Sequence, residues 1–188
     1  MAYKKIWMTS VLMIGLAAAL PGCSQWNQHR HECACRKLLR HPSRVAHSPL
    51  YKIINCKPQW TTLAKAIRKA HLKQTFSQPG AYYTFFAPTN AAFSQLAPSK
   101  LALLMKPENR QSLRNLIFYH AIPHAVVPDP HRSTLRELTA NGHKVVLTTV
   151  NGKIMTINGL PIISGPIMVD NAAIYTIGQV LTPPPGNR

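Results

Sequence analysis

Acidic residues are scarce in this chain, whose 188 residues include 5 Asp and Glu against 22 Lys and Arg. A site built from many carboxylates, such as a calcium cage, is therefore not expected. Glycine is also sparse, with 9 residues, whereas 16 prolines argue against a bundle made of helices alone. Hydrophobic residues still make up 46% of the chain, which excludes a wholly disordered basic segment. The length suits one domain of ordinary size with some additional sequence.

A long hydrophobic run is missing as well. The apolar stretch near the N-terminus, residues 11–20, is shorter than the roughly 20 residues that span a bilayer. It follows Lys4 and Lys5 and is itself followed by small residues. A basic start, a short apolar run and a small residue before the cleavage point predict a signal peptide over residues 1–22.

The end of that run carries more specific information. Leu20-Pro21-Gly22-Cys23 resembles a bacterial lipobox, in which Cys23 is acylated and becomes the mature N-terminus. Ser24 in the next position resembles the pattern sorted to the outer membrane of Gram-negative bacteria. The sequence thus predicts an outer-membrane lipoprotein of the cell envelope. The alternative is a plain secretory signal that is cut nearby and leaves Cys23 an ordinary thiol in a secreted protein.

The positive charge is large, +17 for the whole chain, and falls to +15 once the two lysines of residues 1–22 are removed. Outside the cytoplasm, nucleic acid is not expected as the primary partner. The expected partner is an unidentified protein or an anionic polymer of the envelope or matrix, besides the membrane that holds the lipidated N-terminus. A basic segment near anionic headgroups gains roughly 1 kcal/mol per residue. The alternative interpretation of the charge is an ordinary solvated surface.

Residues 23–49 are predicted to be an irregular, exposed tether that is rich in His and basic residues. His29, His31, Cys33 and Cys35 occupy alternate positions, so an extended chain would place all four on one face. Imidazole and thiolate suit zinc or copper(I), which makes these four residues a candidate metal site.

A disulfide is the competing use of the cysteines, because thiols of secreted proteins oxidise. If Cys23 is lipidated, Cys33, Cys35 and Cys56 remain. One of the first two would pair with Cys56, with Cys35–Cys56 as the candidate pair, and one thiol would be left over.

Residues 50–184 show the pattern of a folded domain, and residues 185–188 form a short C-terminal tail. The spacing of Leu63, Ala66, Ile67 and Ala70 predicts a helix with one apolar face. Further helices are expected within 91–105 and 107–120. Strands are expected at 82–86, 144–149, 153–157, 162–163 and 174–181, the second and third being joined by the hairpin dipeptide at 151–152. Helices followed by hairpins indicate an α+β domain.

Three segments of this domain are similar to a known family. Residues 83–93 (YTFFAPTNAAF), 115–120 (NLIFYH) and 170–181 (DNAAIYTIGQVL) resemble the first signature, the central Tyr-His motif and the second signature of fasciclin-like (FAS1) domains. The resemblance covers 50–184. It implies a single domain with helices packed on a β-sandwich or wedge of mostly antiparallel strands. It also implies a non-catalytic adhesion or interaction module without a cofactor.

The chain departs from the family pattern at four positions. Asn90 stands where Asp is usual, Ala172 where Gly is common, Tyr175 where His is common and Gly178 where Asp is common. Asn90 can still accept a hydrogen bond at a helix start, so the fold is expected to survive.

Tyr119 and His120 are the candidate binding residues, because the Tyr-His region is implicated in integrin recognition in animal members of the family. From the residues alone, His120 is either a buried histidine with both nitrogens satisfied or a catalytic base, which would need a partner group beside it. The chain has no Gly-x-Ser-x-Gly, phosphate-loop or His-Glu-x-x-His motif. An enzyme is therefore not expected.

Overall fold

A seven-stranded sheet with the order β2-β1-β7-β6-β5-β4-β3 forms the centre of the computed structural model, which describes residues 23–184. The strands are β1 (Tyr83–Pro88), β2 (Ala121–Ile122), β3 (Thr134–Leu138), β4 (Lys144–Val150), β5 (Lys153–Ile157), β6 (Leu160–Val169) and β7 (Ala172–Ile177). In this part of the chain β1 and β7 run parallel, and the other five strand pairings are antiparallel. The α+β class with a mostly antiparallel sheet is thus confirmed.

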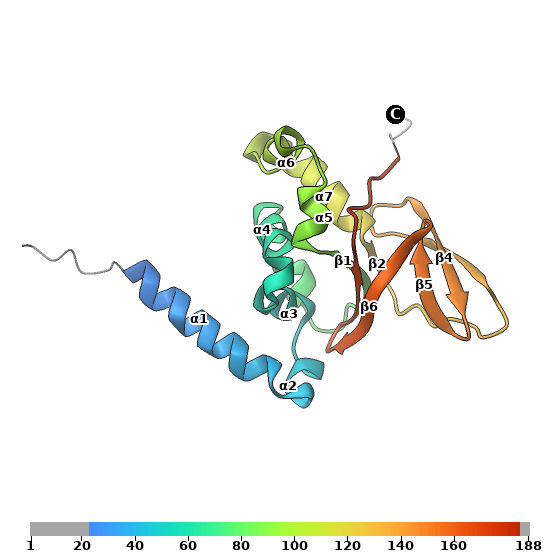
Figure 1. The fold of residues 1–188 in the computed structure, drawn as a ribbon, viewed down its shortest axis with the longest axis horizontal. Coiled ribbons are helices and arrows are strands. Elements are labelled where there is room, and N and C mark those ends of the chain that lie inside the picture. Colours follow the sequence, from blue (N-terminus) through green and yellow to red (C-terminus); the bar gives the residue numbers. More distant parts are fainter. Residues whose placement is uncertain (1–22, 185–188) are drawn as a thin grey trace, which may run out of the picture.

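The helices gather at one side of the sheet, and the β4–β5 hairpin lies at the opposite side (Figure 1). They are α1 (Cys23–Leu39), α2 (Pro42–Ala46), α3 (Leu50–Cys56), α4 (Thr61–Lys69), α5 (Asn90–Ser94), α6 (Pro98–Leu104) and α7 (Arg110–Tyr119), with 3-10 turns η1 (Pro58–Trp60), η2 (Thr75–Ser77) and η3 (Pro107–Asn109). Between residues 23 and 184, no helix combines the length and the apolar character needed to cross a bilayer.

Strand β1 separates two hydrophobic clusters, because successive side chains of a strand point to opposite faces. Phe85 and Ala87 join the cluster under the helices, whereas Phe86 joins the cluster under β4 and β5. Its neighbour β7 follows the same alternation and is buried along its whole length. Both faces of this strand pair are therefore covered, one by helices and the other by the hairpin.

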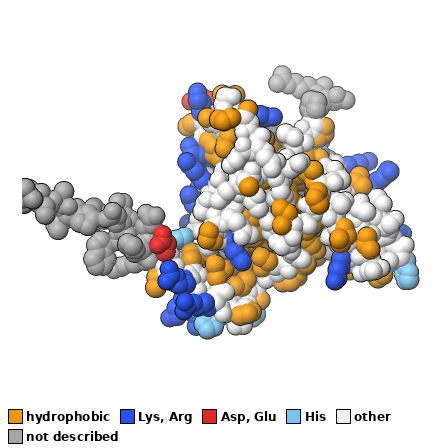
Figure 2. All heavy atoms as spheres, in the orientation of Figure 1, with side chains coloured by type: hydrophobic (Ala, Val, Ile, Leu, Met, Phe, Trp, Pro, Cys, Tyr) orange, Lys and Arg blue, Asp and Glu red, His pale blue; other side chains and the backbone are white. Residues whose placement is uncertain are grey.

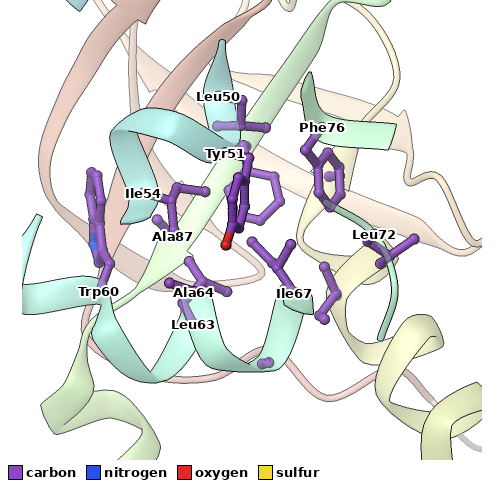
Figure 3. Packing of buried hydrophobic residues seen from close by; sticks show 14 of the residues in the cluster. Leu50, Tyr51, Ile54, Trp60, Leu63, Ala64, Ile67, Leu72, Phe76 and Ala87 are labelled. Atoms are coloured by element: carbon purple, nitrogen blue, oxygen red, sulfur yellow. The ribbon is translucent and has the colours of Figure 1, made fainter. Parts of the chain in front are cut away.

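The helical cluster is built from α3, α4 and β1 (Figure 3). Trp60 of η1 and Leu63 and Ile67 of α4 belong to this cluster, and each is at most 2% exposed. Burial of such side chains contributes roughly 1.5–3 kcal/mol each to folding. The apolar face predicted for residues 63–70 is confirmed, since all four of its residues are buried.

The predicted hairpin is also confirmed. Asn151 and Gly152 both have positive φ, 49° and 71°, as a tight turn between twisted strands requires. Asn158 and Gly159 repeat this geometry with φ of 49° and 78°, so the chain turns again into β6. The sequence had indicated only that β5 ends there.

The expected irregular tether is wrong for residues 23–39 and 42–46, which are helical. Residues 23–39 contain neither proline nor glycine, so nothing in them interrupts a helix. Cys35 and Leu38, three positions apart on one face of α1, are buried against the domain. Ser48 is also buried, and its carbonyl oxygen accepts a hydrogen bond from the Asp170 amide (3.1 Å). The predicted signal peptide, the lipobox residues before Cys23 and the tail 185–188 lie outside the described residues.

Candidate functional site

His120 follows directly after α7 and is 2% exposed. Its Nδ1 donates to the Leu116 carbonyl (2.7 Å), and its Nε2 accepts from the Leu181 amide (3.0 Å). This arrangement needs the neutral imidazole, because a protonated ring has no acceptor nitrogen. Burial, only partly offset by the bond to Leu116, lowers the pKa of His120 to about 4. His120 is therefore a buried histidine with both nitrogens used, as one of the two interpretations of the sequence expected.

Tyr119 is buried as well, at 4% exposure. Its hydroxyl accepts a hydrogen bond from the Asn158 side-chain amide (3.0 Å), and its ring stands edge-on to His143 at 6.0 Å. Tyr119 and His120 thus connect the end of α7 to the β5–β6 turn and to the segment after β7. Both residues have a structural role here, and their role in binding a partner stays a prediction.

Two residues of the first signature segment, residues 83–93, make hydrogen bonds at the starts of two helices. Thr89 caps α5, since its hydroxyl accepts from the amide three residues further on (3.1 Å). Asn90 instead reaches α4, where its Oδ1 accepts from the Thr62 amide (3.0 Å) and the Thr61 hydroxyl (3.2 Å). Its Nδ2 donates to the Pro58 carbonyl (2.9 Å), which an aspartate could not do. The unusual Asn90 therefore fits its surroundings, because both its oxygen and its nitrogen make hydrogen bonds inside the protein.

The His and Cys side chains that the structure brings together, His31, Cys35 and Cys56, differ from the four residues predicted as a metal site. In a helix, positions two apart do not face the same way, so His29, His31, Cys33 and Cys35 do not share a face of α1. Cys35 is joined to Cys56 by a disulfide, with Cα atoms 5.0 Å apart, and this is the candidate pair named from the sequence. Cys33 is a free, exposed cysteine of the described chain. The side chain of His29 lies outside the described part.

His31 lies beside the disulfide, because it is one helical turn before Cys35 on the same face of α1. Its ring nitrogens are 3.7 Å from the Cys35 sulfur, and the potential ligand atoms of His31, Cys35 and Cys56 all lie within 4.8 Å of one another. Of the donors in the predicted set, His31 and Cys35 are brought together, and Cys56 from α3 joins them. Metal binding by this cluster stays a prediction.

The positive charge is concentrated on the helical side. Residues 31–120 contain 14 Lys and Arg against 2 acidic residues, whereas residues 121–184 contain 4 against 3. The two ion pairs of the described chain, His124–Glu137 (3.0 Å) and Arg132–Asp129 (3.7 Å), both lie in the second of these segments. Figure 2 shows Lys and Arg side chains along the helical edge of the molecule. This face presents cations without ion-paired carboxylates in the described chain.

Two surface hollows were not foreseen from the sequence, because residues far apart in the chain form each of them. One, of about 530 Å³, lies between α1, α3 and α4 and is lined by Arg68 and Lys73 among others. The other, of about 550 Å³, lies at the sheet and includes Tyr82 and Tyr175. Burial raises the pKa of both tyrosines, and their mutual proximity adds to the effect on Tyr175, so both hydroxyls are protonated donors at neutral pH.

Comparison with known proteins identifies the family to which this fold belongs. The fasciclin domain family matches residues 58–183, so the chain belongs to the fasciclin family. A solved FAS1 domain pair from the insect cell adhesion molecule fasciclin I shares the fold, with a TM-score of 0.61 at 11% identity, covering 74% of this chain and 52% of that one.

Bacterial relatives are similar over most of the domain. Protein sll1483 of the cyanobacterium Synechocystis is 30% identical over 125 residues, covering 66% of this chain and 68% of that protein. The cell surface glycolipoprotein MPB83 of Mycobacterium bovis is 28% identical over 145 residues, covering 74% of this chain and 63% of its own. The chain spans only 18% of the length of several animal relatives.

Proposed function

We propose that this protein is a non-catalytic interaction module of the cell envelope, held there by a lipid on Cys23. The observation that carries the interaction part is the uneven charge: 14 basic against 2 acidic residues in the helical segment 31–120. Positive potential over one face attracts anionic partners and steers their approach. The adhesion molecule fasciclin I, whose FAS1 domains share this fold, gives the module its functional class by analogy.

The absence of catalysis is part of the proposal. In the described chain His120 is buried, and both of its nitrogens bond to the backbone. A general base must reach a substrate proton, and the imidazole in this position does not. The motifs of common hydrolases and phosphate-binding enzymes are missing from the sequence.

The anchor rests on the lipobox-like Leu20-Pro21-Gly22-Cys23 and on the glycolipoprotein among the relatives. Several acyl chains on one cysteine hold a protein at a membrane stably, because each buried CH₂ adds roughly 0.8 kcal/mol. With Ser24 behind the cysteine, the outer membrane is the proposed location.

A pull-down from intact cells, with washes at rising salt, tests the interaction. An anionic envelope polymer held by charge should elute steeply as the ionic strength rises, since salt screens exposed charges. A protein partner with a packed interface should resist the same washes. Recovery of no envelope component at low salt would contradict the proposal.

A second candidate function is metal binding, favoured by the cluster of His31, Cys35 and Cys56. The disulfide occupies both sulfurs, so a thiol reductant must first open it to give two thiolate ligands for zinc or copper(I). Metal analysis of the reduced protein tests this against Cys35→Ser, with Cys33→Ser as the control. The hypothesis expects loss of metal in Cys35→Ser alone, and equal, negligible metal in all three proteins excludes it.

A further inference from the structure

The hollow between α1, α3 and α4 is lined without a carboxylate. Its lining includes two cations, Arg68 of α4 and Lys73 of the segment after α4, and the imidazole of His31 from α1. Tyr51, Asn55 and Thr61 add polar groups, and the volume of about 530 Å³ is open to solvent. A space of this kind favours an anion over a cation or an apolar ligand.

Arg68 is held in place by one of its two terminal nitrogens. Nη1 donates to Asn55 Oδ1 (2.9 Å) and to Tyr51 Oη (3.4 Å), which uses both of its hydrogens. The remaining N–H groups, on Nε and Nη2, have no hydrogen-bond partner among the side chains and backbone that the structure describes, residues 31–184. These two nitrogens form the planar fork that binds two oxygens of a phosphate at once. Arg68 is thus oriented by the protein while its recognition edge is left free.

Asn55 connects this arginine to α1. Its Oδ1 accepts from Arg68, and its Nδ2 donates to Nε2 of His31 (2.6 Å). The Cys35–Cys56 disulfide fastens α1 to the end of α3 just beyond Asn55. The wall that α1 contributes is therefore fixed by a covalent bond and a hydrogen-bond chain.

Lys73 supplies a second cation to the same hollow. Its ammonium lies 5.9 Å from the centre of the Tyr51 ring, and neither of the ion pairs in the described chain involves it. The acid nearest in sequence to this wall is Glu32, which lines the adjoining hollow together with Arg36 and Lys57. Cations therefore outnumber carboxylates in both hollows.

We propose that the hollow formed by His31, Tyr51, Asn55, Arg68 and Lys73 binds a phosphate group, with Arg68 as the bidentate donor and Lys73 as the second cation. The proposal deepens the proposed function and rests on it for the anionic character of the partner. The same chemistry is offered by a phospholipid headgroup and by a soluble phosphate compound. The lipid is the nearer source if Cys23 is anchored, because α1 starts at that residue.

Calorimetric titration of the full-length protein in non-ionic detergent tests the site with two probes. One probe is inorganic pyrophosphate, and the other is the same detergent doped with phosphatidylglycerol, both at low salt. Arg68→Gln removes the fork and should weaken binding about tenfold to a hundredfold, as loss of a charge-assisted hydrogen bond does. Lys73→Gln should weaken it less. The matched control is Lys153→Gln, an exposed lysine of β5, which removes the same charge and should leave the affinity unchanged.

The two probes distinguish the possible sources of the phosphate. Binding of both probes supports recognition of the phosphate group itself, binding of doped detergent alone assigns it to a lipid headgroup, and binding of pyrophosphate alone assigns it to a soluble compound. Equal affinities for Arg68→Gln and Lys153→Gln, or no binding of either probe, would overturn the site. If the site fails while salt-sensitive retention on intact cells persists, the interaction function stands with a different contact. Thermal melts of each variant check that these exposed substitutions leave the fold intact.

Discussion

At the scale of single residues, His120 links a protonation event to the stability of the fold. Its pKa of about 4 in the folded protein lies below the 6.5 of a free histidine, so the unfolded chain binds this proton first as pH falls. The contribution of the neutral imidazole is therefore complete above pH 6.5 and is lost between pH 6.5 and 4. The shift corresponds to a loss on the order of 3 kcal/mol.

Urea unfolding of the wild type and of His120→Gln across this pH range isolates the effect. Glutamine can also donate to Leu116 and accept from Leu181, but it does not titrate. We expect the difference between the two free energies of unfolding to shift by about 3 kcal/mol in favour of the variant between pH 7 and pH 4. Parallel profiles would show that His120 is not buried in its neutral form.

The same scale shows what the sequence could and could not foretell. The sequence showed that Asn90 can accept a hydrogen bond at a helix start, but not that this start belongs to α4 while Thr89 caps α5. The Thr62 donor and the Asn90 acceptor lie 28 residues apart in the chain, and no local pattern reports such a contact. Arg68 is a similar case, since its neighbours Tyr51 and Asn55 belong to another helix.

At the scale of elements, periodic patterns located several helices and strands with a buried face, although the strand expected at 174–181 ends at Ile177. The helix around Leu63 was predicted from its apolar spacing, and the hairpin at 151–152 from its turn residues. Both are present in the structure. Strands β2 and β3 were missed: β2 has two residues, and β3 is an edge strand without a buried side chain. Helix α1 was missed because its described buried residues are few, and one of them is a cysteine whose partner lies 21 residues away.

The disulfide is expected to hold α1 to the domain. Cross-linking across this separation stabilises a fold by about 3 kcal/mol in the chain-entropy view. Cys56→Ser should lower the unfolding free energy by 2–4 kcal/mol, about the usual range. It should also speed trypsin cleavage after Arg36 and Lys37, because these side chains are already exposed and a detached α1 can unfold locally, as seen by mass spectrometry of the fragments.

Cys33→Ser is the matched control, because Cys33 is exposed and unpaired in the described chain. It should leave both the stability and the trypsin pattern unchanged. Equal digestion of the Cys56→Ser protein and the wild type would mean that α1 is held by packing alone.

At the scale of the whole molecule, the two sides of the fold differ in charge. The sheet side carries nearly balanced charge, while the helical side carries 14 basic residues against 2 acidic ones and begins at the residue expected to bear the lipid. The sequence alone gives +15 for residues 23–188 and does not tell which side of the fold carries this charge. The packing of the helices onto one side brings many of these cations to one edge of the molecule, while others lie on the hairpin side (Figure 2).

The family and the α+β architecture were predictable at this scale, because three signature segments stand in the right order along one domain. The location of the cations was not, since it depends on which helices share a side. The proposed envelope-anchored module with basic residues on its helical side is consistent with both observations.

Fractionation of cells that express the wild type or Cys23→Ala tests this account most directly. The account predicts wild-type protein in the outer-membrane fraction, resistant to salt washes because acyl chains do not respond to ionic strength. It predicts Cys23→Ala in the soluble fraction, with the part that remains on membranes released by salt. A wild-type protein that is already soluble and carries no lipid on Cys23 would contradict the account.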